Sequence, residues 1–338
     1  MSVSIQRSTE RDKQTRQFIL DAESKRTQFG LTFLDDSLYG MLPNDLVLIG
    51  AKTGRGKTAL AVNIAKHNAM LGKRVVFIAL EAEENEIEMR LRYQIEASLL
   101  FQDETRDRSI VINYRNWRFG KLERALARHQ DAATLEFNKR YATLLTIYRR
   151  QGFGVKDLND VLEKVKGKAE LVILDHLHYL DMESGQSENE SLSALMKKMR
   201  ELNLFYNIPF VVAAHLRKSI ESLIPGDEDF RGSGDIGKIA TTCIMLTPQP
   251  DKFNATQQTS STIISIAKSR TGGLGNLCGI MDFSIRHQAY LPFYRLAYVF
   301  NNGGIKELEE AEYPDWASKL WFKKSPPTVF DQKGHTNS

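Results

Sequence analysis

A glycine-rich segment at residues 50–58, GAKTGRGKT, constrains the fold of this chain more than any other feature. An apolar run at residues 46–49 precedes it, and a run with helical character at residues 59–65 follows it. Strand, glycine-rich turn and helix in this order form a phosphate-binding loop, because the glycines let backbone N–H groups surround an anion that also faces the positive end of the new helix. The first position of the usual G-x-x-x-x-G-K-[ST] pattern is Ala51 instead of glycine. The context on both sides nevertheless predicts a nucleotide site.

The loop residues have distinct expected roles. Lys57 should reach the β- and γ-phosphates of ATP or another NTP, and the Thr58 hydroxyl should ligate Mg²⁺. The other loop positions that we expect to contact the nucleotide are Ala51, Thr53, Gly54 and Gly56.

Two acids follow buried strands that we predict at residues 75–80 and 171–174. Glu81 stands where a nucleotide-hydrolysing enzyme holds its attacking water, and Asp175 ends a Walker B pattern and should hold Mg²⁺ directly or through a water. The alternatives are an acidic first helical turn for Glu81 and a turn cap for Asp175. We favour the functional interpretation for both.

Three histidines lie near predicted strand ends. His176, His178 and His215 are too irregularly spaced to predict a metal site. His215 follows the strand predicted at residues 208–214, where an imidazole can sense the γ-phosphate by hydrogen bonding.

Composition adds weaker constraints. A hydrophobic fraction of 42% in 338 residues is enough for a sizeable core, and a net charge of +4 permits a nucleic-acid partner without requiring one. Cys243 and Cys278 stand far apart in apolar runs, which predicts reduced core residues. No apolar run approaches the ~18 residues of a membrane span, and residues 1–26 lack the apolar region of a secretory signal. We expect a cytoplasmic protein without a membrane partner.

Two further segments and one aromatic residue are ambiguous alone. Residues 230–236 form a glycine-rich loop before a helix, and residues 268–273 place a cationic pair and Gly-Gly after a strand predicted at residues 261–267. The second segment is either a solvated hairpin or an arginine finger offered to a neighbour's nucleotide. Trp117 could stack on nucleic acid, but a packed aromatic on a helix is favoured.

Together these elements resemble the RecA-like core of hexameric replicative DNA helicases of the DnaB family, most closely its phage-type and Twinkle-like branch. The resemblance covers about residues 29–300 and includes Ala51 at the start of the loop, the Leu80-Glu81 pair and the 173–176 Walker B segment. It also includes the segments at 215–218, 230–234 and 268–272. We therefore expect an α/β fold with a mostly parallel central sheet flanked by helices.

The resemblance implies roles that the residues alone do not reveal. Arg270 would enter the adjacent subunit's site together with Lys268, and His215 would report on the phosphate. Single-stranded DNA would be held by Arg231, Gly232, Ser233, Gly234 and Lys238. The implied cofactors are ATP and Mg²⁺, and the implied partners are a self-associated ring, most often a hexamer, and a loader, primase or other replication protein. The resemblance also implies that the protein serves a bacterial, plasmid or phage replication system.

We divide the chain into an N-terminal arm or linker helix (1–28), a RecA-like ATPase domain (29–302) and a C-terminal tail (303–338). The arm either packs on a neighbouring subunit or frays. We expect no primase or zinc-binding module ahead of the core. Two other functions stay open: a RecA- or KaiC-like ATPase in recombination or regulation without unwinding, and a nucleotide-gated loader or assembly module.

Overall fold

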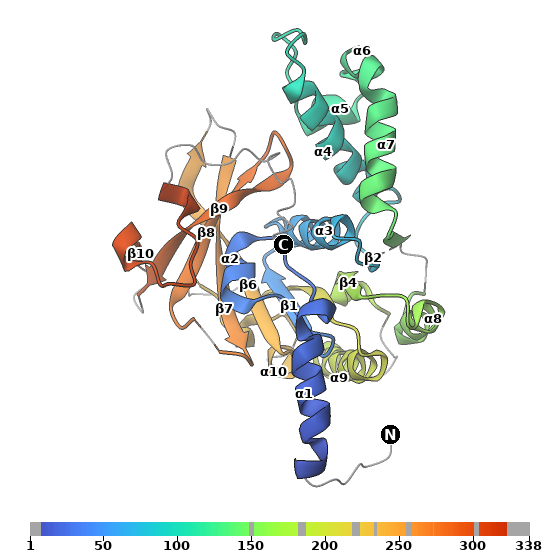
Figure 1. Ribbon diagram of the computed structural model, residues 1–338, viewed down its shortest axis with the longest axis vertical. Coiled ribbons are helices and arrows are strands. Elements are labelled where there is room, and N and C mark those ends of the chain that lie inside the picture. Colours follow the sequence, from blue (N-terminus) through green and yellow to red (C-terminus); the bar gives the residue numbers. More distant parts are fainter. Residues whose placement is uncertain are drawn as a thin grey trace.

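The computed structural model describes residues 8–148, 152–181, 187–217, 224–232, 235–254, 259–272, 274–300 and 304–322. They form a ten-stranded sheet in the order β10-β9-β8-β7-β6-β1-β5-β4-β2-β3, with helices on its faces (Figure 1). This arrangement confirms the predicted α/β fold, although the strands beyond β6 are antiparallel.

One half of the sheet is parallel and carries the apolar runs seen in the sequence. Strands β1, β2, β4 and β5 are buried along most of their length, as expected where helices cover both faces, whereas β3 has no buried residue. The strands of this half are β1 (Leu46–Ala51), β2 (Val75–Ala79), β3 (Leu144–Tyr148), β4 (Leu171–Asp175), β5 (Phe210–His215) and β6 (Thr242–Asn254).

The other half is a series of antiparallel hairpins. Strand β6 continues to Asn254 because its second half pairs with β7 after it leaves β1. The remaining strands are β7 (Thr259–Ser269), β8 (Leu277–Ser284), β9 (Ala289–Val299) and β10 (Ile305–Glu307).

Each face of the sheet has its own core because side chains alternate along a strand. On β1, Val47 and Ile49 belong to one apolar cluster, and Leu46 and Leu48 belong to the other. The first cluster includes residues of α2 (Thr32–Leu38), α3 (Lys57–Met70), α4 (Glu86–Gln102) and α7 (Gln130–Tyr141). The second includes residues of α8 (Val155–Val165), α9 (Glu188–Tyr206) and α10 (Asp235–Ile239).

A helical lobe between β2 and β3 rises beyond the sheet (Figure 1). It contains α4, α5 (Tyr114–Arg118), α6 (Glu123–Leu126) and α7. Trp117 packs against Tyr93 and Tyr114, and its indole N–H donates to Glu96. These contacts support the packed-aromatic interpretation of Trp117.

The two ends of the described chain differ in how they pack. Helix α1 (Ser8–Lys25) projects from the body and has no buried residue (Figure 1). In contrast, residues 305–322 return to the sheet: β10 pairs with β9, and the Tyr313 hydroxyl accepts the Leu296 N–H at 2.7 Å. The C-terminal segment therefore packs on the domain as far as Phe322, whose ring centroid lies 5.0 Å from that of Tyr313.

The short 3-10 helices are η1 (Ala127–His129), η2 (Leu177–Tyr179), η3 (Asp227–Asp229), η4 (Glu310–Glu312) and η5 (Leu320–Phe322). Cys243 and Cys278 are buried and unpaired, as predicted, and burial raises the pKa of each thiol to about 12. Within the described ranges, we find no helix with the length and apolar character needed to cross a bilayer.

Candidate nucleotide site

The glycine-rich loop connects the end of β1 at Ala51 to the start of α3 at Lys57. Its residues 52–55, which include Thr53 and Gly54, are exposed. Gly56 is the N-cap of α3 and has φ 93°, a left-handed conformation that favours glycine. The loop therefore opens the positive end of a 14-residue helix toward solvent, which is the geometry of an anion site.

The Lys57 side chain folds back into this loop. Its ammonium donates to the carbonyl oxygens of Ala51 at 3.0 Å and Lys52 at 3.3 Å. Burial lowers the pKa of Lys57, and the nearby carboxylates of Glu81 and Asp175 partly oppose that effect. The loop lysine thus stands between the loop and the two strand-end acids.

Asp175 ends β4 and is fully buried. Neither of its carboxylate oxygens has a hydrogen-bond partner, which is unusual for a buried acid. Burial raises the pKa of Asp175 to about 6. The nearby Thr58 hydroxyl acts to lower this pKa, although it does not reach full hydrogen-bond geometry. Two unpartnered oxygens beside a hydroxyl are suitable ligands for Mg²⁺, which prefers oxygen.

Glu81 and His215 lie near Asp175 from the strands on either side of β4. Glu81 follows β2, its backbone N–H donates to the Asp175 carbonyl at 3.3 Å, and the residue is exposed. His215 is the last residue of β5 and is half-buried. Burial, followed by the charge of Lys57, lowers the pKa of His215 to about 4, so its imidazole is neutral at pH 7.

The glycine-rich loop after η3 is attached directly to His215. The backbone N–H of Arg231 donates to the His215 carbonyl at 2.8 Å, and the Arg231 guanidinium pairs with Glu188 at 3.2 Å. Gly232 has φ 99°, and a Cβ at this position would lie 2.2 Å from Leu192 Cδ1. Only glycine therefore fits where the loop passes α9.

Two other residues that we predicted to bind DNA, Ser233 and Gly234, lie outside the described residues. Lys238 is on α10, and its ammonium pairs with Asp235 at 3.0 Å. The ammonium of Lys268 donates to the carbonyls of Gly237 at 2.9 Å and Lys238 at 2.7 Å, so this lysine is tied to α10.

Arg270 lies at the opposite edge of the sheet, where the parallel strands begin, whereas the glycine-rich loop lies where they end. Its backbone N–H donates to the Thr241 carbonyl at 3.1 Å, and Thr241 in turn donates to the carbonyl of Leu46, the first residue of β1. Five strand steps of about 3.3 Å separate Leu46 from Ala51, or roughly 16 Å, and the loop lies beyond Ala51. The structure thus gathers Lys57, Thr58, Glu81, Asp175 and His215, and leaves Arg270 and Lys268 outside that group.

A cavity of about 610 Å³ lies beside the loop and was not predicted from the sequence. Gly54, Arg55 and Gly56 line one side, and residues of the antiparallel strands, including Phe283 and Tyr290, line the other. The antiparallel hairpins bring these two aromatics to the loop, and that placement depends on the order of the strands in the sheet.

A phosphate-binding loop after β1, acids after β2 and β4, and a mostly parallel sheet with helices on both faces define a RecA-like P-loop NTPase domain. The sequence profile of the DnaB-like helicase C terminal domain matches residues 27–285. The chain therefore belongs to the DnaB-like helicase C-terminal domain family.

Named relatives agree with this assignment. The chain is 25% identical over 266 residues to the replicative DNA helicase DnaB of Geobacillus stearothermophilus, which covers 76% of this chain and 55% of that protein. The chain is also 25% identical over 254 residues to the replicative DNA helicase DnaB of Treponema pallidum. That match covers 73% of this chain and 52% of that protein. The chain thus spans about half the length of these relatives.

Two solved structures share the fold. One is a DnaB-like replicative helicase described with its primase interactions; the TM-score is 0.63, with 21% identity, over 86% of this chain and 67% of that one. The other is the ATPase domain of G40P, with a TM-score of 0.67 and 20% identity, over 86% of this chain and 100% of that one.

Proposed function

We propose that this chain is the motor of an ATP-dependent DNA helicase or translocase that acts as a ring on single-stranded DNA during DNA replication. The observation that carries the proposal is the position of Arg270. The loop, Glu81 and Asp175 lie together at one edge of the sheet, and the arginine that would complete the site lies at the other. A neighbouring subunit arranged head to tail would supply it, and such an arrangement closes into a ring or continues as a filament.

Each residue at the loop edge has a chemical task in hydrolysis. Lys57 and the backbone N–H groups of the loop would hold the β- and γ-phosphates. Mg²⁺, held by the Thr58 hydroxyl and the buried Asp175 carboxylate, would neutralise phosphate charge. Glu81 would orient and polarise the attacking water, and Arg270 of the neighbour would stabilise the charge that develops on the transferred group.

The cavity beside the loop would take the rest of the nucleotide. Its volume of about 610 Å³ lies within the range of pockets for small molecules, and Tyr290 and Phe283 offer apolar surface for a base. The pocket supports ATP or another NTP as the nucleotide, without selecting among them.

The link between His215 and Arg231 would couple phosphate to DNA. A change in the His215 position would be transmitted through its carbonyl to the Arg231 amide, and thus to the loop at 231–234. That loop and Lys238 would grip the DNA backbone, so binding should tolerate sequence changes and weaken with salt.

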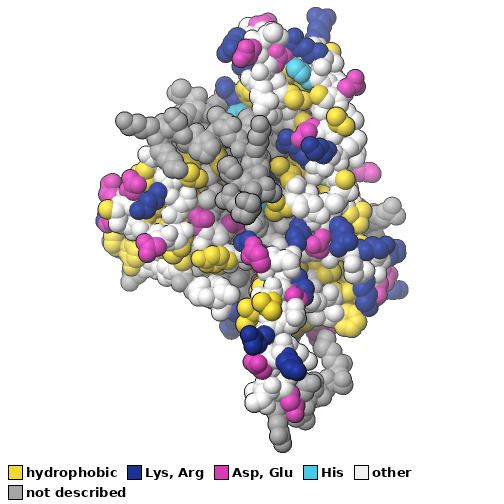
Figure 2. Space-filling view, viewed as in Figure 1, with side chains coloured by type: hydrophobic (Ala, Val, Ile, Leu, Met, Phe, Trp, Pro, Cys, Tyr) yellow, Lys and Arg dark blue, Asp and Glu magenta, His cyan; other side chains and the backbone are white. Residues whose placement is uncertain are grey.

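The N-terminal arm would help to join the subunits, and we favour a hexamer. Phe18, Ile19 and Leu20 expose 44%, 65% and 75% of their surfaces on α1, where Figure 2 shows charged side chains of both signs mixed with hydrophobic ones. A loader or primase would be an additional partner. We place the protein in the cytoplasm of a bacterial host, in a bacterial, plasmid or phage replication system, and in the phage-type and Twinkle-like branch.

Strand displacement on a forked DNA substrate tests the proposal. ATP-dependent displacement, together with hydrolysis stimulated by single-stranded DNA, is expected. Hydrolysis and DNA binding without displacement, even with partner proteins added, would favour a recombinase-like or regulatory ATPase. Hydrolysis that DNA does not stimulate would favour a nucleotide-gated loader or assembly module.

A further inference from the structure

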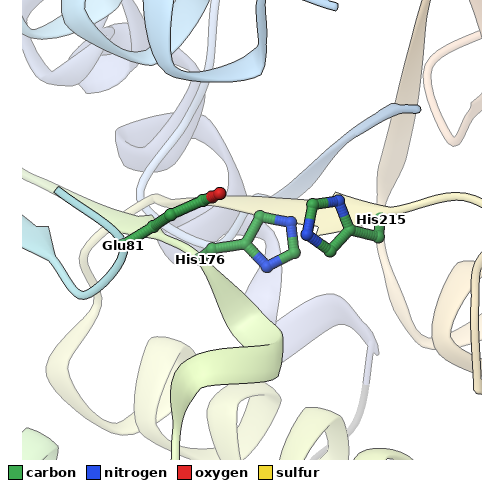
Figure 3. Close-up of side chains that lie close together, drawn as sticks. All are labelled: Glu81, His176 and His215. Atoms are coloured by element: carbon green, nitrogen blue, oxygen red, sulfur yellow. The ribbon is translucent and has the colours of Figure 1, made fainter. Parts of the chain in front are cut away.

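We propose that Glu81, His176 and His215 form a binding site for a transition-metal dication, with Zn²⁺ as the best match, next to the nucleotide site. Each residue offers one ligand atom, and these atoms all lie within 4.8 Å of one another. Figure 3 shows the Glu81 carboxylate and ring nitrogens of the two histidines turned toward a common space. The sequence spacing did not predict this group.

The order of the strands explains why three distant residues meet. Glu81, His176 and His215 come from the carboxyl ends of β2, β4 and β5, and β4 lies between the other two. The pairs Ala79–Asp175 and Leu174–Val212 fix the register of these strands. The backbone therefore positions the three side chains at one edge before any ion binds.

The buried imidazoles have unmet hydrogen-bonding capacity. His176 is fully buried, and its Nε2 has no hydrogen-bond partner, as is also true of His215 Nδ1. The other His176 nitrogen, Nδ1, accepts a long bond of 3.3 Å from the His178 amide. An unpartnered buried nitrogen is costly, and a metal ion at Nε2 would satisfy it. The ring proton would move to Nδ1, and the long bond to His178 would be given up.

The donor set selects the class of ion. Two imidazoles and one carboxylate are the three protein ligands of some tetrahedral zinc sites, in which water takes the fourth position. Mg²⁺ prefers oxygen ligands, so it matches Thr58 and Asp175 better than this group. Tetrahedral zinc ligands about 2.0–2.1 Å from the ion lie roughly 3.4 Å apart, so the most widely separated pair of ligand atoms must close by up to about 1.4 Å. Glu81 is exposed and has room to make that adjustment.

The local charge balance is compatible with a cation. Glu81 and the neighbouring Asp175 contribute two carboxylates, which oppose the positive charge of Lys57. The His178 ring, whose centroid lies 5.1 Å from that of His176, adds a further neutral imidazole at the border of the group.

Occupation of the site would hold the Glu81 carboxylate on the metal. The ion would therefore inhibit hydrolysis, because in the proposed function Glu81 orients the attacking water. This consequence rests on the proposed function. Metal binding itself does not depend on that function.

Calorimetric titration of the full chain with Zn²⁺, without nucleotide, tests the site directly. One ion per chain is expected. Two variants should weaken Zn²⁺ binding: His176→Phe, which fills the buried volume, and Glu81→Gln, at an exposed position. Loss of a group that only supports a ligand typically costs about 10- to 100-fold in metal affinity, so loss of a ligand should cost at least as much. Circular dichroism would verify that both variants are folded.

Two control variants locate the ion. His67→Gln removes a half-buried imidazole that bonds to Gln28, away from the group, and should leave Zn²⁺ affinity unchanged. Asp175→Asn should lower the affinity much less than His176→Phe, because Asp175 is a neighbour and not a ligand. Equal affinity in wild type and His176→Phe, loss of binding only in Asp175→Asn, or no binding at micromolar Zn²⁺ would each overturn the proposal.

Hydrolysis measurements separate this inference from the proposed function. Zn²⁺ should inhibit the wild type and inhibit His176→Phe less. If the wild type hydrolyses ATP and binds no Zn²⁺, the metal site is wrong and the function stands. If Zn²⁺ binds with the expected variant pattern and Glu81→Gln hydrolyses ATP normally, the site stands and the role of Glu81 is wrong.

Discussion

Arg270 and Lys57 lie at opposite edges of one sheet. The Arg270 backbone N–H is hydrogen-bonded to the Thr241 carbonyl, beside the first residue of β1. Lys57 begins the helix that follows the loop at the other end of β1. The length of β1, roughly 16 Å, and the loop beyond it separate the two. A single subunit therefore cannot place both cationic side chains on one nucleotide.

Replacement of Arg270 by alanine should reduce hydrolysis by roughly 10³-fold or more and leave nucleotide binding intact, because in the proposed mechanism the arginine would act on transition-state charge. Steady-state hydrolysis and binding of a fluorescent nucleotide would measure the two effects. Mixing Arg270→Ala with Lys57→Ala subunits should restore some activity if the arginine acts between subunits.

The matched control is Arg74→Ala, since Arg74 precedes β2 at the same edge as Arg270 and makes a surface ion pair with Glu170. Such a pair contributes at most about 1 kcal/mol, so hydrolysis should not change. Normal hydrolysis in Arg270→Ala would remove that residue from the site.

Gly232→Ala should destabilise the protein by about 1–3 kcal/mol and weaken binding of single-stranded DNA. The new Cβ meets Leu192 Cδ1 at 2.2 Å, and φ 99° is strained for any side chain. Urea unfolding and fluorescence anisotropy with labelled DNA would measure the changes. Gly167→Ala is the comparison, because Gly167 has φ 68° but nothing lies near its Cβ. Equal costs at the two positions would show that the contact with Leu192 is unimportant.

Asp35 should give the stability a pH dependence that Asp35→Asn removes. Its carboxylate accepts the Phe29 N–H at 2.7 Å, and burial raises its pKa from 3.8 to about 6. Because the folded state binds this proton more tightly, the contribution is present below about pH 4 and is lost as the pH rises through 6. The stability of wild type relative to Asp35→Asn should thus fall by about 2–3 kcal/mol between about pH 4 and pH 8. Urea unfolding of both proteins across this range would measure it, and a constant difference would contradict it.

A charge on the arm should weaken subunit association. Leu20 is 75% exposed on α1 and adds little to the fold of the subunit. Leu20→Asp should therefore leave the melting temperature of the monomer unchanged and lower the fraction of ring, because it buries a charge in the proposed contact. Mass photometry with an ATP analogue would measure the ring. Gln14→Asp makes the same charge change on the same helix, and an equal loss of rings in both variants would indicate a general charge effect.

Much of the site was predictable because its parts are local. A strand, a glycine turn and a helix are contiguous at residues 46–70. Glu81 and Asp175 each end an apolar run that can be recognised as a buried strand without information from the rest of the chain. The long β6, the pairing of β10 with β9 and the cavity beside Gly56 were not predicted. Each of these features depends on hairpins folding back onto the sheet, and no short stretch of residues encodes that pairing.

The sequence by itself determined which chemical groups follow which strands, since strand ends and turns are set by neighbouring residues. Only the tertiary structure decided which of those groups meet. The order β5-β4-β2 brings His215, His176 and Glu81 within reach of one another, and the antiparallel course of β7 carries Arg270 to the far edge. Pairing between distant strands, stabilised by burial of both faces of the sheet, sets these distances.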